Sequence, residues 1–301
     1  MIYDYDREEL IYENYKENDY CVYKLNTVYS DEKMYVHVFE PEKKVLGDIV
    51  FVHGIGGRNI KYLQWYGRFF SKKGYRTSFT ILPFHGERKP EGIYDGDPFY
   101  SSDPYKCNNL FHNSVKDVRR TIDLVETFNE YNSDNLYIMG VSMGGMIAVM
   151  ASALDKRIKK TILMITGGNW RWINFYSPYT QKVRDEYEKY GNEWGCHCEK
   201  DCLKYRKDAF SDVQKNINKI EDIFSVPKIM CFQYDPLSYA KFIDNEVLFI
   251  SGIYDKVIPE KSVEELYNMI KNKKRIKFPG GHKSSIAFKR YLAYKVLKFI
   301  K

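Results

Sequence analysis

Ser142, Asp255 and His282 are the residues whose types and settings suggest chemistry most directly. A serine hydroxyl is a weak nucleophile at neutral pH, and it attacks a carbonyl only when a positioned imidazole accepts its proton. A carboxylate on the far side of the imidazole holds the ring in the orientation that this transfer requires. The three residues therefore predict acyl-transfer chemistry, with Ser142 as nucleophile, His282 as general base and Asp255 as the residue that orients the base.

The setting of Ser142 strengthens this prediction. The residue lies in Gly-Val-Ser-Met-Gly-Gly, between an expected strand at 135–141 and an expected apolar helix at 143–154. A turn from strand to helix this sharp needs small neighbours, which Gly140 and Gly144 provide. The start of the helix would favour negative charge next to the serine. The alternative is a tight turn that carries an incidental serine.

His282 and Asp255 each follow an expected strand. His282 ends the segment Pro-Gly-Gly-His, immediately before the last expected helix. Asp255 lies just beyond the strand at 246–251, in the segment Ser-Gly-Ile-Tyr-Asp. Positions after parallel strands meet at one edge of a sheet, where ligands bind in open α/β folds.

A second glycine-rich turn, at 53–57, follows the expected buried strand at 47–53. Such a turn lets backbone N–H groups approach a tetrahedral oxyanion. We expect the donors to be the backbone N–H groups of Ile55 and Met143, and we expect His53 to brace the loop. The alternative is a simple glycine turn.

The remaining rivals for the base are His37, His85 and His112. We expect His37 to belong to a strand and His112 to cap or pack near the start of a helix.

Alternating strands and helices place these residues in an α/β protein with a mostly parallel sheet and helices on both faces. Period-two alternation or short buried apolar runs indicate eight strands, at 20–29, 34–40, 47–53, 75–82, 135–141, 159–166, 246–251 and 275–278. Amphipathic periodicity indicates helices at 61–73, 111–131, 143–154, 262–270 and 284–299.

The alternation breaks between two consecutive strands. About 70 residues separate them, whereas an ordinary connection has about 2–6. We therefore predict an N-terminal part of the core at 1–166, an inserted helical cap at 167–240 and a C-terminal part of the core at 241–301.

The cap region is rich in aromatic side chains. Trp170, Trp172 and Tyr176 are the candidates for an apolar substrate pocket. Equally, these rings could form the core of the cap itself.

The segment Cys196, His197, Cys198 and Cys202 has four potential metal ligands. It lacks the paired C-x-x-C arrangement of strong zinc sites, and three adjacent ligands wrap poorly around one ion. The cysteines are therefore weak candidates for a metal site, with a redox pair or ordinary cap residues as alternatives.

Composition limits the remaining classes. The net charge is +7, and the cations are scattered, which does not favour a nucleic-acid partner. The sequence has no membrane-spanning run and starts without a secretory pattern, so we expect a cytoplasmic protein with reduced cysteines. Oligomeric state is open.

Several motifs together resemble the α/β-hydrolase superfamily, specifically its capped serine esterases, lipases and acyl-hydrolases. They are HGIGG at 53–57, PFHGER at 83–88, GVSMGG at 140–145, SGIYDKVIP at 251–259 and PGGH at 279–282. The resemblance implies a sheet of about eight strands, hydrolysis without a cofactor, and an acyl-enzyme. A serine at position 142 argues against the dehalogenase and epoxide-hydrolase branches, which carry aspartate there. Arg88 stands where serine is common in the family, and we expect it to be structural.

The leading function is hydrolysis of a carboxylic ester, with a small-molecule ester or acyl compound as substrate. A peptidase, thioesterase or acyltransferase would use the same three residues, and neither the fold nor the residues choose among them. A ligand-binding receptor of the same fold without turnover is the alternative from another class.

Overall fold

A computed structural model of the chain describes residues 2, 5, 7–226 and 228–301. Its centre is a nine-stranded sheet in the order β1-β2-β3-β5-β4-β6-β7-β8-β9. The strands from β5 to β9 in this order are parallel, whereas β1, β2 and β3 add antiparallel strands at one edge. The bounds are β1 Tyr12–Glu17, β2 Tyr20–Asn26, β3 Lys33–Phe39, β4 Gly47–Val52, β5 Tyr75–Ile81, β6 Leu136–Val141, β7 Lys160–Met164, β8 Glu246–Gly252 and β9 Lys273–Phe278.

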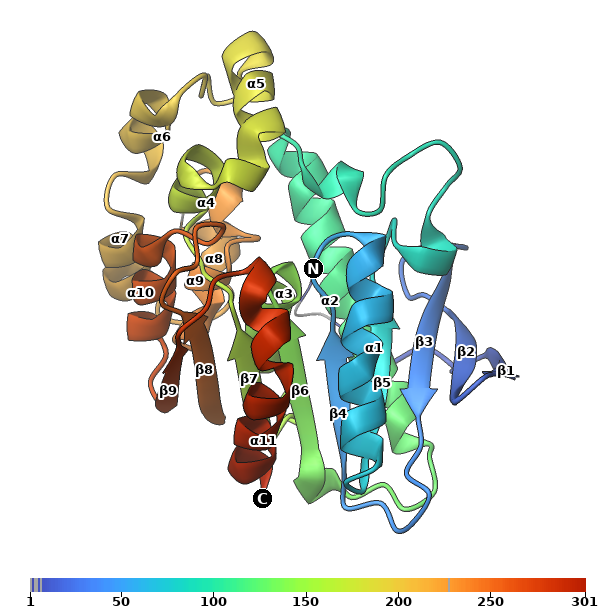
Figure 1. Ribbon diagram of the computed structural model, residues 1–301. Helices are drawn as coiled ribbons and strands as arrows, with labels where there is room; N and C mark the ends of the chain where they lie inside the picture. The colour runs from blue at the N-terminus through green and yellow to red at the C-terminus, as the bar shows by residue number, and fades with distance from the viewer. Residues whose placement is uncertain (1, 3–4, 6, 227) are drawn as a thin grey trace.

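Helices cover both faces of this sheet (Figure 1). Helices α1 (Gly57–Ser71) and α11 (Lys289–Ile300) lie on one face, and α2 (Pro104–Glu126) and α3 (Met143–Leu154) lie on the other. The central strands are buried on both faces, because alternate side chains of β4 enter opposite cores: Ile49 packs on the α1 side and Val50 on the α2 side. The predicted α/β-hydrolase architecture is confirmed.

The sheet has one strand more than the eight expected. Strand β1 pairs with β2, and all six of its residues are exposed. An edge strand without a buried face has no alternation of apolar and polar residues, which is why its sequence, Tyr-Glu-Asn-Tyr-Lys-Glu, resembles an irregular polar stretch.

Helix α2 starts seven residues before the expected position 111. Asp103 caps it: its carboxylate accepts the N–H groups of Tyr105 (2.9 Å) and Lys106 (3.2 Å). Pro104 occupies the first helical position, where its missing N–H group costs nothing. His112 consequently lies well inside α2, which corrects the expectation that it sits near a helix start.

The segment between β7 and β8 is helical, and α4, α5 and α6 rise above the sheet at the top of Figure 1. Its α-helices are α4 Trp170–Tyr176, α5 Gln181–Tyr190, α6 Glu199–Arg206, α7 Ala209–Asn216, α8 Asp222–Ser225 and α9 Pro236–Ala240. Helix α9 contacts α3 and α10 (Glu260–Met269). The residue limits proposed for the cap stay a prediction.

A buried ion pair connects distant parts of this segment. The guanidinium of Arg206 pairs with the carboxylate of Asp235, and both side chains are fully enclosed. Asp235 also accepts the backbone N–H groups of Asn169 (2.8 Å) and Trp170 (3.0 Å), at the start of α4. The pair therefore fixes the start of α4 against α6 and α9.

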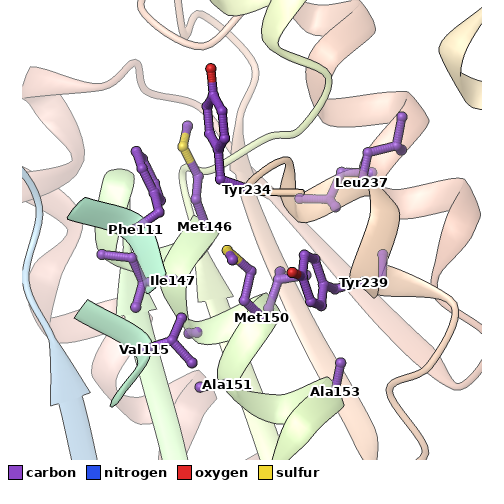
Figure 2. Close-up of a cluster of buried hydrophobic side chains, with 14 of the residues drawn as sticks. Phe111, Val115, Met146, Ile147, Met150, Ala151, Ala153, Tyr234, Leu237 and Tyr239 are labelled. Atoms are coloured by element: carbon purple, nitrogen blue, oxygen red, sulfur yellow. The ribbon is translucent and has the colours of Figure 1, made fainter. Parts of the chain in front are cut away.

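Helix α3, which follows Ser142, lies between α2 and the end of the inserted segment (Figure 2). Phe111 from α2 and Tyr234 and Leu237 from the inserted segment pack around Met146 and Met150 of α3. Because this cluster is buried, the start of α3 has a fixed position relative to the cap.

Candidate active site

Ser142 lies at the junction of β6 and α3 in a backbone conformation that non-glycine residues rarely adopt, with φ 56° and ψ −122°. A Cβ atom at position 144 would approach the carbonyl oxygen of Val52 to 2.2 Å, and one at position 140 would approach the carbonyl oxygen of Gly144 to 2.3 Å. Only glycine fits at either position, so both glycines permit the turn that presents the serine.

Ser142, His282 and Asp255 come together as a continuous hydrogen-bonded series. The Nε2 atom of His282 lies 2.9 Å from the Oγ atom of Ser142, and its Nδ1 atom lies 2.9 Å from Oδ2 of Asp255. The side chains of His282 and Asp255 are largely buried. With the ring proton on Nδ1, donated to the carboxylate, Nε2 is free to accept the serine proton.

The carboxylate of Asp255 is held by its own loop. Its Oδ1 atom accepts the N–H groups of Val257 (2.8 Å) and Ile258 (3.1 Å). The histidine loop lies against this one, since a Cβ atom at Gly281 would lie 2.5 Å from the carbonyl oxygen of Tyr254. The two loops after β8 and β9 therefore fix both partners of the imidazole.

The glycine-rich turn after β4 lies beside the serine. A Cβ atom at Gly54 would lie 3.2 Å from the Cβ atom of Ser142. His53 braces this turn as expected: Nδ1 lies 2.7 Å from the carbonyl oxygen of Gly54, and Nε2 accepts the N–H group of Leu82 (3.1 Å).

His85, a rival for the base, braces the same turn from the other side. Its Nε2 atom accepts the N–H group of Gly56 (3.1 Å), while Nδ1 lies 2.8 Å from the carbonyl oxygen of Pro83. Burial lowers the pKa of His85 to about 4 and holds the pKa of His53 well below its usual value. Both rings therefore stay neutral at pH 7, as acceptors at Nε2.

A cavity opens next to Ser142, between the core of the fold and the inserted segment. Ile55 and Met143 line it together with the serine. Most of its other walls are apolar or aromatic, and they come from α2, α4, α5 and the segment before α9.

Comparisons with known proteins give the family of this chain. The family model of the FSH1 serine hydrolases matches residues 86–284, which is more than half of the chain and includes all three residues of the hydrogen-bonded series. The chain belongs to the FSH1 serine hydrolase family. No curated protein sequence gives a significant match.

Solved structures similar to this FSH1 family member share its fold at low sequence identity. Acetyl xylan esterase 1 from Thermoanaerobacterium sp. JW/SL YS485 is 18% identical, with a TM-score of 0.56, over 93% of this chain and 86% of that one. Acetyl xylan esterase from Paenibacillus sp. R4 is 15% identical, with a TM-score of 0.65, over 97% and 90%. A cold-adapted esterase from an Arctic intertidal metagenomic library is 14% identical, with a TM-score of 0.58, over 95% and 99%.

Of the three aromatic residues proposed for a pocket, only Trp170 lines the cavity beside the serine. Trp172 instead donates its indole N–H to Glu265 (2.8 Å), and Tyr176 is 52% exposed, with its hydroxyl on Glu199. The sequence prediction overlooked Phe99, Phe111 and Tyr234, which line the cavity from other segments. No local sequence pattern distinguishes these three residues from ordinary aromatic residues of a hydrophobic core.

The structure does not bring the four candidate metal ligands of the cap together. Cys196 and Cys202 are buried, whereas His197 and Cys198 are exposed. Within the described ranges, no group of three or more His, Cys, Asp or Glu side chains is arranged to hold a metal ion. The six cysteines are free thiols.

Arg88 and the two remaining rival histidines, His37 and His112, lie away from Ser142. Arg88 is buried and pairs with Asp117 of α2, and its guanidinium also donates to Glu32 (2.9 Å). His37 lies in β3, with its Nε2 atom 2.7 Å from the carboxylate of Glu87. His112 donates its Nε2–H group to the backbone carbonyl oxygen of Gln233 (2.8 Å). These contacts connect secondary-structure elements.

Among the described residues of this hydrolase, none of the helices has the length and the apolar character that spanning a membrane requires.

Acid should destabilise this hydrolase through its buried histidines. Burial lowers the pKa of both His85 and His112 to about 4, whereas an unfolded histidine titrates near 6.5. Only the unfolded state binds these protons between the two values, so stability is complete above pH 6.5 and falls as the pH drops toward 4. At pH 5 the expected loss is about 2 kcal/mol for each histidine.

The measurement is urea unfolding at pH 7 and pH 5 for the wild type and His112→Gln. The variant keeps a donor for the carbonyl oxygen of Gln233. Its free energy of unfolding should differ less between pH 7 and pH 5 than that of the wild type. The exposed His197→Gln variant is the matched control and should behave as the wild type. If the free energy of unfolding of His112→Gln fell between pH 7 and pH 5 as much as that of the wild type, His112 would not contribute to the destabilisation by acid.

Proposed function

We propose that the protein hydrolyses carboxylic esters of small molecules through an acyl-enzyme on Ser142. The observation that carries this proposal is the pair of 2.9 Å contacts at His282, one to the serine hydroxyl and one to the carboxylate of Asp255. This arrangement matches the geometry by which a serine becomes a nucleophile at neutral pH.

In the proposed reaction, the hydroxyl oxygen of Ser142 attacks the ester carbonyl while Nε2 of His282 takes the hydroxyl proton. Asp255 holds the ring and stabilises the imidazolium that forms. The imidazolium then gives its proton to the leaving alcohol, and the carbonyl reforms as an acyl-serine. Water, deprotonated by the same Nε2, attacks the acyl-serine in the second half and releases the acid and the free serine.

The backbone N–H groups of Ile55 and Met143 are the proposed donors to the oxyanion. Met143 is the first residue of α3, a position whose N–H group has no acceptor within its own helix. The dipole of α3 adds to this stabilisation of negative charge. His53 and His85 support the other donor, because they fix the backbone of Gly54 and Gly56 on either side of Ile55.

An ester suits the cavity better than a peptide does. The space beside Ser142 is lined in part by the cap and is predominantly apolar, which favours a small acyl compound over an extended chain with backbone hydrogen bonds. The three esterases described above share the fold, and esters are their substrates by name. The cytoplasmic location and the lack of a nucleic-acid partner stay predictions.

The test compares a butyryl p-nitrophenyl ester, a butyryl thioester and a butyryl anilide in a stopped-flow instrument, with acid-quenched samples weighed by mass spectrometry. We expect a burst of p-nitrophenol and an adduct of one butyryl group on Ser142 with the ester. A higher kcat/KM for the thioester or anilide would assign the enzyme to another acyl-hydrolase class. One burst without turnover would favour the receptor alternative.

A further inference from the structure

A second cavity lies inside the cap. Its walls come from α4, α5, α6 and the segment 229–234, and they include Phe175, Tyr187, Cys196, Cys202 and Cys231. The described contacts of the proposed reaction use none of these residues.

The two cavities share one wall. Trp170, Asn174 and Tyr234 line both the cavity beside Ser142 and the cap cavity. The indole N–H group of Trp170 donates to the carbonyl oxygen of Tyr234 (3.3 Å), and the two rings lie 5.6 Å apart between centroids. Phe111 supports the indole edge-to-face at 5.1 Å. These contacts make the wall a defined partition.

The chemistry of the cap cavity favours an apolar occupant. Burial raises the pKa of Cys196 to about 11 and that of Cys202 to about 12, so both thiols are neutral. The one fully buried cation of this wall, Arg206, is already balanced by Asp235. Arg171, the other arginine of this wall, pairs with Glu199 (2.8 Å). Neutral thiols, aromatic rings and paired arginines match a hydrocarbon chain better than an ion.

We propose that the partition of Trp170 and Tyr234 sets the upper length of the acyl chain, and that the cap cavity is the space into which a longer chain extends once the indole is removed. This inference rests on the proposed ester hydrolysis and names its substrate class: esters of short to medium apolar acids. Trp170 is a residue that determines specificity, because it touches the distal end of the chain and takes no part in bond making.

The test measures kcat/KM for p-nitrophenyl esters from acetate to palmitate with the wild type, Trp170→Ala and Trp170→Leu. In the wild type, kcat/KM should fall beyond a limiting chain length. In the variants, the ratio of laurate to butyrate activity should rise at least tenfold, because the merged cavity accepts the longer chain. Tyr176→Ala, from the exposed side of the same helix, is the matched control and should keep the wild-type ratio.

A reversal variant separates cavity merging from general loosening of the cap. Trp170→Ala combined with Cys202→Met places a larger side chain in the cap cavity, so it should return the ratio toward the wild-type value. Circular dichroism and the melting temperature establish that each variant is folded, and Trp170→Leu serves where Trp170→Ala does not fold. An unchanged chain-length profile in folded Trp170→Leu would overturn the proposal, as would a ratio that Cys202→Met leaves high.

A binding measurement distinguishes this inference from the proposed function. Calorimetric titration of laurate into Ser142→Ala and into Ser142→Ala with Trp170→Leu requires no turnover. Tighter binding to the double variant supports the partition even where no ester is hydrolysed, and equal affinities refute it. For acetyl esters of alcohols of increasing length, kcat/KM should not depend on replacement of Trp170. If the replacement changed kcat/KM in this series and not in the acyl series, the assignment of the cavity to the acyl chain would be refuted.

Discussion

Replacing Ser142 by alanine should reduce the turnover of p-nitrophenyl butyrate about 10⁶-fold, the order of magnitude of the loss in kcat when a serine nucleophile is removed. The alanine keeps the fold but leaves the Nε2 atom of His282 without the hydroxyl that lies 2.9 Å away. No acyl-enzyme can then form. A fluorophosphonate probe, which reacts with activated serines, should add once to the wild type and not to the variant.

Ser225→Ala is the control, because Ser225 is an exposed serine at the end of α8. It should keep both probe labelling and turnover. The backbone strain at position 142 stays the same with alanine, because φ remains positive. The melting temperature should therefore change little. If Ser142→Ala retained labelling or turnover above one hundredth of the wild type, another residue would have to be the nucleophile.

The central sheet and the three proposed catalytic residues were predictable because their signals are local. A strand buried on both faces, such as β4 or β6, is a short apolar run bounded by turns. The turn at Ser142 requires glycines at fixed distances, for the steric reasons that the close approaches to Val52 and Gly144 now show. Parallel strands then bring residues far apart in sequence to one edge.

Strand β1 and the start of α2 were missed for different reasons. Strand β1 has six exposed residues and therefore no burial pattern from which to predict it; its pairing with β2 is the only thing that defines it. The start of α2 did carry a signal: Asp103 before Pro104 is typical of a capped helix start. The apolar periodicity of the helix becomes regular only further along the chain.

The walls of the cavities depend on how the cap packs, which the sequence does not encode locally. Helix α4 carries aromatic residues on several faces, and the anchoring of its start by Asp235 decides that Trp170 turns toward the serine while Tyr176 faces solvent. Asp235 lies 65 residues beyond Trp170 in the chain. No spacing rule connects two such residues, so the sequence alone leaves both interpretations of these aromatic rings open.

Replacing Asp255 by asparagine should lower kcat about 10⁴-fold near neutral pH, although the side chain keeps its size. The Oδ1 atom accepts two backbone N–H groups, from Val257 and Ile258. The amide oxygen of the asparagine must take that place, because an NH₂ group there would face two other donors. The NH₂ group then points at Nδ1 of His282, and a donor at Nδ1 forces the ring proton to Nε2. A protonated Nε2 cannot accept the proton of Ser142.

The same argument fixes what should not change. Since both backbone contacts survive, Asp255→Asn should keep the melting temperature and KM close to the wild type, so the loss appears in kcat. Asp208→Asn is the matched control: Asp208 caps α7 through the N–H group of Ser211 (3.2 Å), and asparagine caps a helix equally well. A kcat within tenfold of the wild type in Asp255→Asn would contradict the assignment, because the orientation of the imidazole would then not depend on that carboxylate.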